Sequence, residues 1–189
     1  MKPPRILFYT HGLVDGGGER LWAGLATALK ERGYDVIFAQ DFDADENRHN
    51  LDPSIRVHTL GRPHLAATRN LARLLRTEKP DVALSAIGGS NLKLLLASLI
   101  SRAPTLPVIT YHGEMEWKSG WLSYFSYAGL PLLSRWAART VTVSDGLFHL
   151  LITKWKAHPA RMVTILNPVF YPDQIDVPTA SDLGKRENV

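Results

Sequence analysis

The sequence predicts an α/β protein with one Rossmann-like, mostly parallel sheet of about seven strands and helices on both faces. Short apolar runs alternate with helical patterns along most of the 189 residues. Most runs are continuously apolar, as in Val36-Ile37-Phe38-Ala39, which is typical of strands covered on both faces. Near the N-terminus, an apolar run, a glycine-rich loop and a helix start follow one another directly.

The expected elements can be placed in order. The strands are 5–11, 35–40, 55–59, 81–85, 107–111, 140–143 and 162–166, and the helices between them are 19–32, 64–78, 92–102 and 145–156. Ser90 or Asn91 is expected to cap the third helix, and Ser144 or Asp145 the fourth. In such sheets ligands bind outside the carboxyl ends of the strands, so the loops that follow the strands should carry the site.

The amino-acid composition excludes several classes of protein. Hydrophobic residues make up 45% and charged residues 21%, as in an ordinary globular domain. The absence of cysteine excludes a disulfide scaffold and a thiolate metal site, and it fits a reducing, cytoplasmic location. The first strand follows the N-terminus too closely for a signal peptide, and no apolar run reaches the roughly 20 residues of a membrane span. Residues 1–171 are expected to form the domain, and the polar segment 172–189 a linker or frayed end.

The formal net charge is +4, and the basic residues show some density at Arg62, Arg69, Arg73, Arg76 and Lys79. The simpler interpretation is a solvated helix face. The alternative is a surface for anionic partners such as phosphates or acidic lipids. No basic run of a recognisable nucleic-acid-binding type is present, so no nucleic-acid partner is expected.

The glycine-rich loop predicts a phosphate site. Gly16, Gly17 and Gly18 let a ligand approach the backbone, and the helix that opens near Glu19 offers unpaired N–H groups. The spacing fails the dinucleotide pattern, because its third glycine position falls on Leu21, and no Gly-Lys-Ser/Thr follows for a P-loop. A tight turn that needs positive φ is the structural alternative, since Gly is the usual residue there.

Other polar residues are expected near the same sheet edge. His112 and Gly113 end the fifth strand, and His11 holds the comparable place after the first. Asp41 and Asp43 follow the second strand, where a ribose-binding acid could sit. A lone histidine is more often a surface or core residue, so position is the main argument for a functional role.

The segment 117–136 is rich in aromatic residues. The favoured interpretation packs Trp121, Tyr124, Phe125 and Ala128 onto the sheet, with Pro131 restarting the helix. The alternative is an exposed aromatic and basic surface for a lipid-linked or membrane-bound substrate.

Three motifs in order resemble the N-terminal half of GT-B glycosyltransferases of family 4. They are Gly17-Gly18-Glu19 at the first helix, Tyr111-His112-Gly113 after the fifth strand, and Val143-Ser144 followed by Ile165-Leu166-Asn167-Pro168-Val169. The resemblance covers nearly the whole chain. Leu166 and Pro168 replace the commoner Pro and Gly of the last motif. The family's second domain, with its paired glutamates, is absent from this sequence, and 172–189 would be the linker toward it.

The resemblance implies a retaining transfer of sugar from a nucleotide-sugar to a glycan or lipid-linked acceptor, without cofactor or metal. It places the donor diphosphate at Gly17 and Gly18, with Glu19 ordering the loop, and it implies that Asn167 is a donor-side residue. It assigns His112 to the transferred sugar as the catalytic residue. The residues that it implies on the acceptor side are His11, Asp15, Arg62 and Arg69. Such a fragment alone is expected to be inactive.

Two other classes stay open. A non-catalytic module that binds a phosphorylated ligand or a membrane surface would use the positive charge and the aromatic segment, consistent with peripheral association at the inner face of a membrane. A sugar-nucleotide epimerase on the same GT-B fold would differ mostly in the other half. A nicotinamide-dependent oxidoreductase is disfavoured by the glycine spacing.

Overall fold

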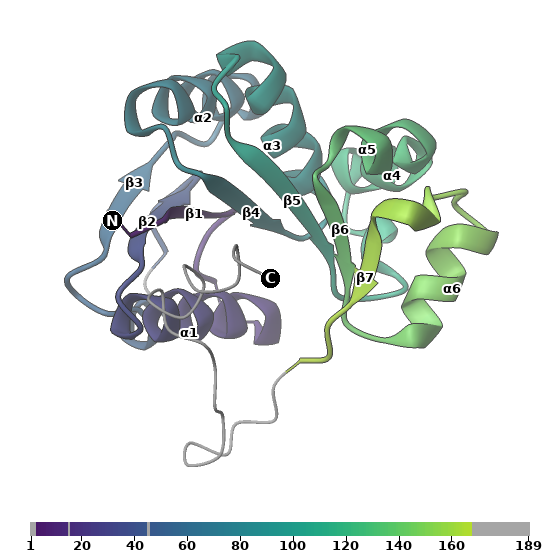
Figure 1. Ribbon diagram of the computed structural model, residues 1–189, viewed down its shortest axis with the longest axis horizontal. Helices are drawn as coiled ribbons and strands as arrows, with labels where there is room; N and C mark the ends of the chain where they lie inside the picture. Colours follow the sequence, from purple (N-terminus) through teal and green to yellow (C-terminus); the bar gives the residue numbers. More distant parts are fainter. Residues whose placement is uncertain (1–2, 15, 45, 168–189) are drawn as a thin grey trace, which may run out of the picture.

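The computed structural model describes residues 3–14, 16–44 and 46–167. Within these residues, one parallel sheet has the strand order β3-β2-β1-β4-β5-β6-β7 (Figure 1). The strands are β1 (Arg5–Thr10), β2 (Asp35–Gln40), β3 (Arg56–Thr59), β4 (Val82–Ala86), β5 (Leu106–Tyr111), β6 (Arg139–Thr142) and β7 (Met162–Thr164). The predicted fold class is confirmed, and each expected strand is present.

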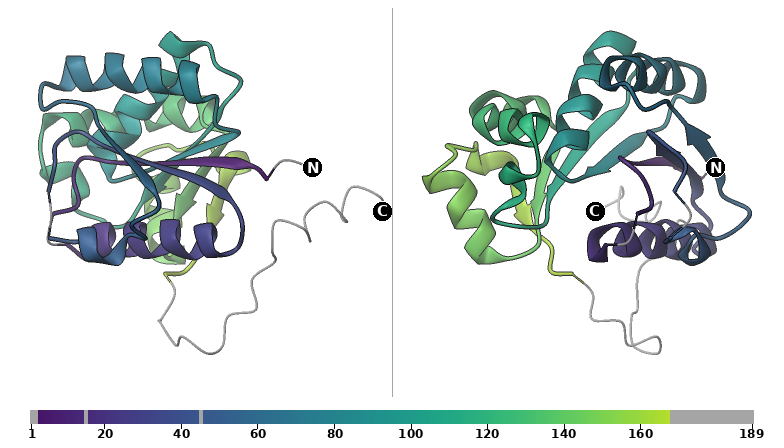
Figure 2. Two further views of the ribbon diagram at one scale, coloured as in Figure 1. Left: turned by 90° about the vertical axis from the view of Figure 1, so that its left-hand side faces the viewer. Right: turned by 180° about the vertical axis from the view of Figure 1, so that it is seen from behind.

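Helices cover both faces of the sheet (Figure 2). They are α1 (Gly17–Glu31), α2 (His64–Glu78), α3 (Gly88–Ser101), α4 (Trp121–Ala128), α5 (Leu130–Trp136) and α6 (Asp145–Thr153). Short 3-10 turns are η1 (Arg48–Asn50), η2 (Glu116–Lys118) and η3 (Pro159–Arg161). Helix α1 lies on one side of the sheet, α2 to α5 lie on the other, and α6 lies at the β6–β7 edge (Figure 1).

Successive side chains of β1 point to opposite faces of the sheet, so this strand contributes to the apolar core on both faces. Leu7 and Tyr9 belong to the buried cluster beneath α2 and α3. Ile6 and Phe8 belong to the cluster beneath α1. A third cluster is shared by β5, α4, α5 and α6. Because successive residues of a strand point to opposite faces, a continuously apolar strand is buried from both sides, as its sequence predicted.

The third helix begins four residues earlier than expected. Ser90 and Asn91 therefore lie inside its first turn and do not cap it. The Asn91 side chain accepts from the Ser85 hydroxyl at 2.7 Å and donates to the Thr110 carbonyl at 2.7 Å, so it joins β4 to β5. A buried amide in this position satisfies its own hydrogen bonds while it fixes the spacing of two strand ends. Ser144, by contrast, caps α6 as predicted.

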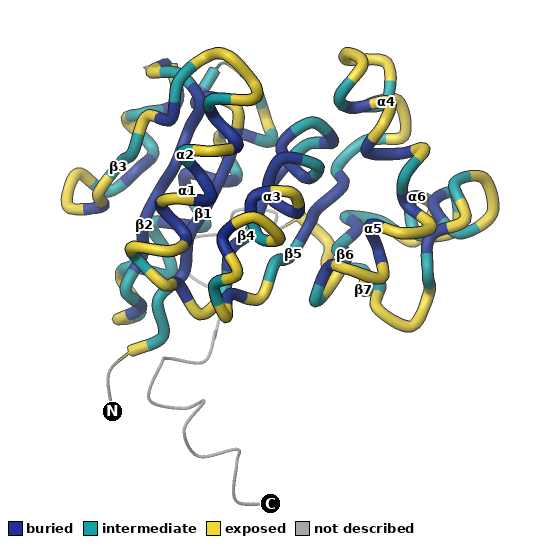
Figure 3. Tube along the Cα trace, turned by 90° about the horizontal axis from the view of Figure 1, so that it is seen from above, coloured by how far each residue is buried: buried dark blue, intermediate teal, exposed yellow. Residues whose placement is uncertain are grey.

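The expected packing of the aromatic segment is wrong. Trp121, Tyr124 and Phe125 are 62%, 47% and 54% exposed, and Ala128 is exposed as well (Figure 3). Helix α4 turns another side inward, which consists of Ser123, Ser126 and Tyr127. The helical spacing of the aromatic residues is the same whether their face is buried or exposed, so spacing alone did not decide between the two. Pro131 does restart the helix as α5.

The predicted linker 172–189 lies outside the described residues. Within the described ones, no helix combines the length and the apolar character needed to cross a bilayer.

Phe8 provides a test of the core. It is fully buried and packs against Trp22 and Phe38, with ring centroids 5.3 Å and 6.5 Å away. Phe8→Ala should lower the free energy of unfolding by about 3–5 kcal/mol, because it leaves a cavity between α1 and the sheet. The exposed Phe125→Ala should change it by less than about 0.5 kcal/mol. Similar losses in urea unfolding for both variants would contradict the assigned burial.

Candidate functional site

A cleft lies at the carboxyl ends of the central strands. The strand order reverses between β1 and β4, because β1 leads to β2 on one side and the chain returns to β4 on the other. At this switch point a cleft of about 210 Å³ opens, the place where doubly wound sheets bind ligands. Its lining comes from five separate segments: His11, Val14, Glu19, His64, Ile87, Gly89, Ser90, Lys93, Ser119, Gly120, Trp121, Leu122 and Ser123.

A buried carboxylate organises one side of this cleft. Asp41 follows β2 and is fully buried. Its Oδ1 accepts from the Tyr9 hydroxyl at 2.7 Å, and its Oδ2 lies 2.7 Å from His11 Nδ1 and within contact of Lys93 Nζ. The four residues come from β1, the loop after β1, the end of β2 and α3. We call them the Asp41 network.

The charges of the Asp41 network depend on one another. Burial alone would raise the pKa of Asp41, but the His11 hydrogen bond and the Lys93 charge outweigh it and hold that pKa below its ordinary value. Burial lowers the pKa of Lys93, and Asp41 partly offsets this effect. Burial and the nearby carboxylate raise the pKa of Tyr9 well above its ordinary value, so Tyr9 stays a donor.

The Asp41 carboxylate also orients His11. With Nδ1 directed at Asp41, the other ring nitrogen, Nε2, is the one available to a ligand, and the side chain is 49% exposed. The ring lies 4.9 Å from the Phe42 ring and 6.1 Å from the His64 ring. The Arg62 guanidinium lies 5.0 Å from the centre of the Phe42 ring. His11 therefore lines the cleft, whereas Arg62 lies behind Phe42 and, like Phe42, is not part of the cleft lining.

The other predicted acceptor-side residues are placed differently. Arg69 is exposed on α2 and is not part of the cleft lining. Asp15 lies outside the described residues.

His112 is held by its neighbours beside the sheet edge. Its Nε2 lies 2.9 Å from the Thr110 hydroxyl, whose own hydrogen goes to the Ser85 carbonyl at 2.8 Å. His112 Nε2 must therefore be the donor, and burial lowers the pKa of the ring so that it favours the neutral form. In that form Nδ1 is an acceptor, and it has no partner within the described residues.

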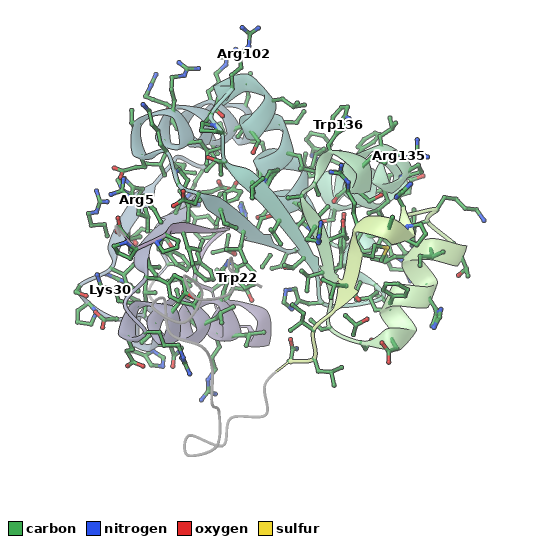
Figure 4. The ribbon with its side chains drawn as sticks, in the orientation of Figure 1. Arg5, Trp22, Lys30, Arg102, Arg135 and Trp136 are labelled. Carbon is green, nitrogen blue, oxygen red and sulfur yellow. The ribbon has the colours of Figure 1, made fainter. Side chains whose placement is uncertain are left out.

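Glu116 fixes the loop behind His112. Its Oε1 accepts from the His112 backbone N–H at 3.0 Å, and the Gly113 N–H also donates to its carboxylate. The Tyr127 hydroxyl donates to the Gly113 carbonyl at 2.8 Å and lies 3.4 Å from Oε2 of Glu116. Burial raises the pKa of Glu116 to about 7, although these hydrogen bonds act in the opposite direction. The edge of the Trp22 ring, which points from α1 toward the sheet (Figure 4), lies 5.9 Å from the His112 ring.

The three glycines at α1 do not need positive φ. Gly16 is the N-cap with an extended φ of −171°, and neither Gly17 nor Gly18 is among the positive-φ glycines. The turn explanation is therefore wrong for this loop. A Cβ on Gly16 would meet the Glu19 carboxylate, which folds back over the loop, whereas a Cβ on Gly17 or Gly18 would enter open space. Contacts within the described protein thus give no reason for glycine at these two positions.

The start of α1 lies next to the cleft but borders a separate hollow. Gly17 borders a second hollow of about 320 Å³ beside η1, and of the predicted donor-side residues only Glu19 reaches the cleft. The Asn47 side chain anchors this loop by donating to the Val14 carbonyl at 2.6 Å. The described residues thus leave the α1 N-terminus as an open ledge next to the cleft.

Asn167 lies apart from both hollows. It follows β7, which is four strands away from β1 in the sheet, or about 19 Å at the usual strand spacing. It is exposed and lines neither hollow. The structure does not bring it to the glycine loop.

Sequence reasoning missed Lys93, His64 and Ser90. Lys93 had a recognisable signal, because a single Lys within Leu92-Lys93-Leu94-Leu95-Leu96 must be buried with a partner if that helix face packs inward. Asp41 was noted only for a ribose. Among the described residues, no group of three or more histidine, aspartate or glutamate side chains is arranged to hold a metal ion.

These features define a Rossmann-like domain with its cleft at the switch point of the sheet. The profile of Glycosyltransferase Family 4 matches residues 15–170. The chain therefore belongs to glycosyltransferase family 4. No curated protein matches it significantly in sequence.

Solved structures agree on the fold. Anabaena HepE in complex with UDP-glucose superposes with a TM-score of 0.62 at 15% identity, over 86% of this chain and 43% of that one. The lipopolysaccharide outer core galactosyltransferase WaaB gives 0.60 at 14%, over 87% and 46%. UDP-N-acetylglucosamine 2-epimerase from Rickettsia bellii gives 0.57 at 8%, over 86% and 44%. The chain thus spans less than half the length of these proteins.

The Asp41–Lys93 pair can be tested by a double-mutant cycle. Asp41→Leu alone should lower the free energy of unfolding by about 3–5 kcal/mol, because it leaves the Lys93 ammonium buried without a partner. Asp41→Leu combined with Lys93→Met should recover much of that loss. A double variant that is less stable than Asp41→Leu, as measured by urea unfolding, would contradict the pairing.

Glu116 should make stability depend on pH. Its pKa is about 7 in the folded protein against an ordinary 4.5, so the folded state holds the proton more tightly between these values. The protonated Glu116 therefore contributes about 1–3 kcal/mol to the free energy of unfolding. This contribution is fully present below pH 4.5 and is lost as the pH rises through 7. Glu116→Gln should remove that decline in a series of unfolding curves, while the exposed neighbour Glu114→Gln should keep it. An unchanged slope in Glu116→Gln would refute the assignment.

Proposed function

We propose that this chain is the acceptor-side half of a retaining glycosyltransferase that transfers a sugar from a nucleotide-sugar to a glycan or lipid-linked acceptor. The observation that carries the proposal is the open ledge at Gly17 and Gly18. These glycines start a helix and need no unusual backbone angle, and a Cβ on either would meet none of the described residues, yet they lie next to the switch-point cleft. Membership of family 4 supports a glycosyl transfer at this place.

The donor would lie across the ledge. The unpaired N–H groups at the start of α1 and the helix dipole stabilise a diphosphate, most strongly as it gains charge on leaving. Glu19 keeps the loop in shape by folding over Gly16. His112 would hold the sugar as it gains oxocarbenium character. Its Nδ1 has no partner among the described residues, but it is buried and His112 lines neither hollow, so a local shift must expose this atom before it can accept a hydrogen bond from a sugar hydroxyl. Asn167 would contact the donor only if the region after β7 moved close to α1.

The acceptor would occupy the cleft. His11 presents Nε2 there because Asp41 holds Nδ1, and Arg62, which lies behind Phe42 and outside the lining, would meet an acceptor that extends past His11. Arg69, farther along α2, would meet only a larger acceptor, and Asp15 remains a proposal from sequence. The departing diphosphate can take the acceptor proton, so this scheme needs no protein base, no cofactor and no metal.

A second domain completes the proposed enzyme. The chain spans less than half of the proteins that it resembles, and the ledge is one wall of a donor site. We therefore expect this chain alone to be inactive and to act when joined to a nucleotide-binding half, at the cytoplasmic side.

One observation favours an epimerase as a second candidate. Glu116, with a pKa near 7, lies directly behind His112, and a carboxyl that can exchange a proton near neutral pH suits epimerisation. Nucleotide-sugar supplied without acceptor separates the two functions, since an epimerase would change the sugar's configuration and a transferase would not. A module that only binds phosphorylated ligands would neither change the configuration of the sugar nor transfer the sugar when an acceptor is added.

The glycosyltransferase proposal predicts the effect of filling the ledge. Gly18→Trp in the protein that carries both halves should lower nucleotide-sugar turnover by about 100-fold or more, because the indole would occupy the diphosphate position. Gly146→Trp is a matched control, since Gly146 is likewise the second residue of a helix and borders open space. Both variants should unfold near the temperature of the parent.

Release of nucleoside diphosphate over a panel of nucleotide-sugars measures the effect. Normal turnover in Gly18→Trp, or an equal loss in Gly146→Trp, would contradict the role of the ledge.

A further inference from the structure

The helices above one face of the sheet expose an unusual amount of apolar surface. Among the described residues, nine of the fourteen exposed large hydrophobic side chains lie on α2 to α5. We call them the apolar face: Leu65, Leu96, Leu99, Ile100, Trp121, Tyr124, Phe125, Leu132 and Trp136. They come from adjacent helices, because α3 packs against both α2 and α4, and α5 packs against α3 and α4. Clustered apolar exposure of this kind marks an interaction surface.

Aromatic residues form the part of the apolar face nearest the cleft. The rings of Trp121 and Tyr124 each meet that of Phe125 edge to face, at 6.1 Å and 5.8 Å between centroids. All three residues are about half exposed or more. Trp and Tyr side chains combine a large apolar body with a polar tip, which suits the boundary between lipid and water.

The charge around the apolar face has one sign. Residues 61–144 hold ten Lys and Arg against four Asp and Glu. Lys93 is buried and paired with Asp41, but the other nine basic residues are exposed, so this part of the surface is positive. Residues 117–144 contain no acidic residue. Figure 4 shows Arg102 and Arg135 projecting at the outer side of these helices, with Trp136 beside Arg135. The acidic residue of α2, Glu78, is engaged by Arg5 and Arg56 on the other side of that helix.

The positive charge indicates whether a second copy of the chain or an anionic bilayer covers the apolar face. A second copy would bring the same positive surface against it, and like charges at an interface repel. An anionic bilayer offers the complementary charge and an apolar interior for the aromatic rings.

The apolar face is continuous with the cleft. Trp121 belongs to both, and its ring meets that of His64 at 6.0 Å on the cleft rim. A headgroup anchored in a bilayer against α4 would therefore lie next to the cleft entrance, with its tail on the apolar side.

We propose that the apolar face docks this protein on an anionic lipid surface and that the cleft takes a lipid-linked acceptor from it. The second part rests on the proposed function, while the docking does not.

Vesicle co-sedimentation of this chain tests the docking directly. The chain should bind phosphatidylcholine vesicles that contain about one quarter phosphatidylglycerol at about 0.02 M salt. Binding should fall about tenfold or more at about 0.5 M salt and in vesicles of phosphatidylcholine alone.

Paired variants identify the surface. Phe125→Ser with Trp136→Ser should weaken binding about tenfold or more, whereas Ile165→Ser with Leu166→Ser, equally exposed after β7, should not. Lys118→Glu with Arg135→Glu should weaken it similarly. Lys30→Glu with Arg32→Glu makes the same charge change at the end of α1, on the other side of the sheet, and should have a smaller effect. Circular dichroism checks that each variant is folded.

Three results would overturn the docking: no binding to the anionic vesicles at low salt, equal losses in the variants and their controls, or a dimer in solution that Phe125→Ser disrupts. The last result would make the face an interface between copies. Each of them leaves transfer to a water-soluble acceptor intact. Conversely, docking by a protein without turnover would leave the lipid surface established and the proposed function wrong.

Discussion

The ionised carboxylate of Asp41 is the constraint on which the candidate site depends. It is fully buried at the end of β2, where an unpaired charge would be strongly unfavourable, and it is compensated by Lys93 from α3 and by hydrogen bonds from Tyr9 and His11. These contacts tie two strands and a helix on opposite sides of the switch point. The floor of the cleft is therefore set by electrostatics as much as by apolar packing.

This constraint divides the roles of the surrounding residues. Lys93 and Asp41 satisfy each other and leave His11 as the exposed member of the network, with its ring orientation fixed. On the other side, Thr110 and Glu116 fix His112 in the same manner through its ring and its backbone. The two imidazoles are thus both oriented, His11 in the cleft lining and His112 against Trp22 of α1. Pre-organised groups of this kind lose little freedom when a ligand binds.

Much of the fold could be predicted from sequence because buried parallel strands have a local signature. Continuous apolar runs such as Val36-Ile37-Phe38-Ala39 can pack only when both faces are covered, and the helices between them fix the handedness. The start of α3 was misplaced because Ser90 and Asn91 have the composition of caps, whereas Asn91 makes its hydrogen bonds to β4 and β5. Local helix-capping preferences carry no information about such tertiary hydrogen bonds.

The site could be predicted only in part. The positions of His11 and His112 near one edge of the sheet could be predicted because strand ends meet there, while their roles in binding and catalysis stay predictions. The pairing of Asp41 with Lys93 joins residues 52 positions apart, which no local pattern reveals. The exposure of Trp121 and its neighbours depends on which side of α4 meets α3, so it too required the structure.

The central claim is that Asp41 is a buried, ionised partner of Lys93 and His11. NMR titration of the Asp41 carboxyl carbon and the Lys93 ammonium in this chain tests it most directly. We expect the Asp41 carboxyl to titrate below its ordinary pKa of 3.8, and the pKa of Lys93 to be lowered by burial but partly restored by the Asp41 charge. An Asp41 carboxyl that takes up its proton at or above the ordinary value would contradict the claim.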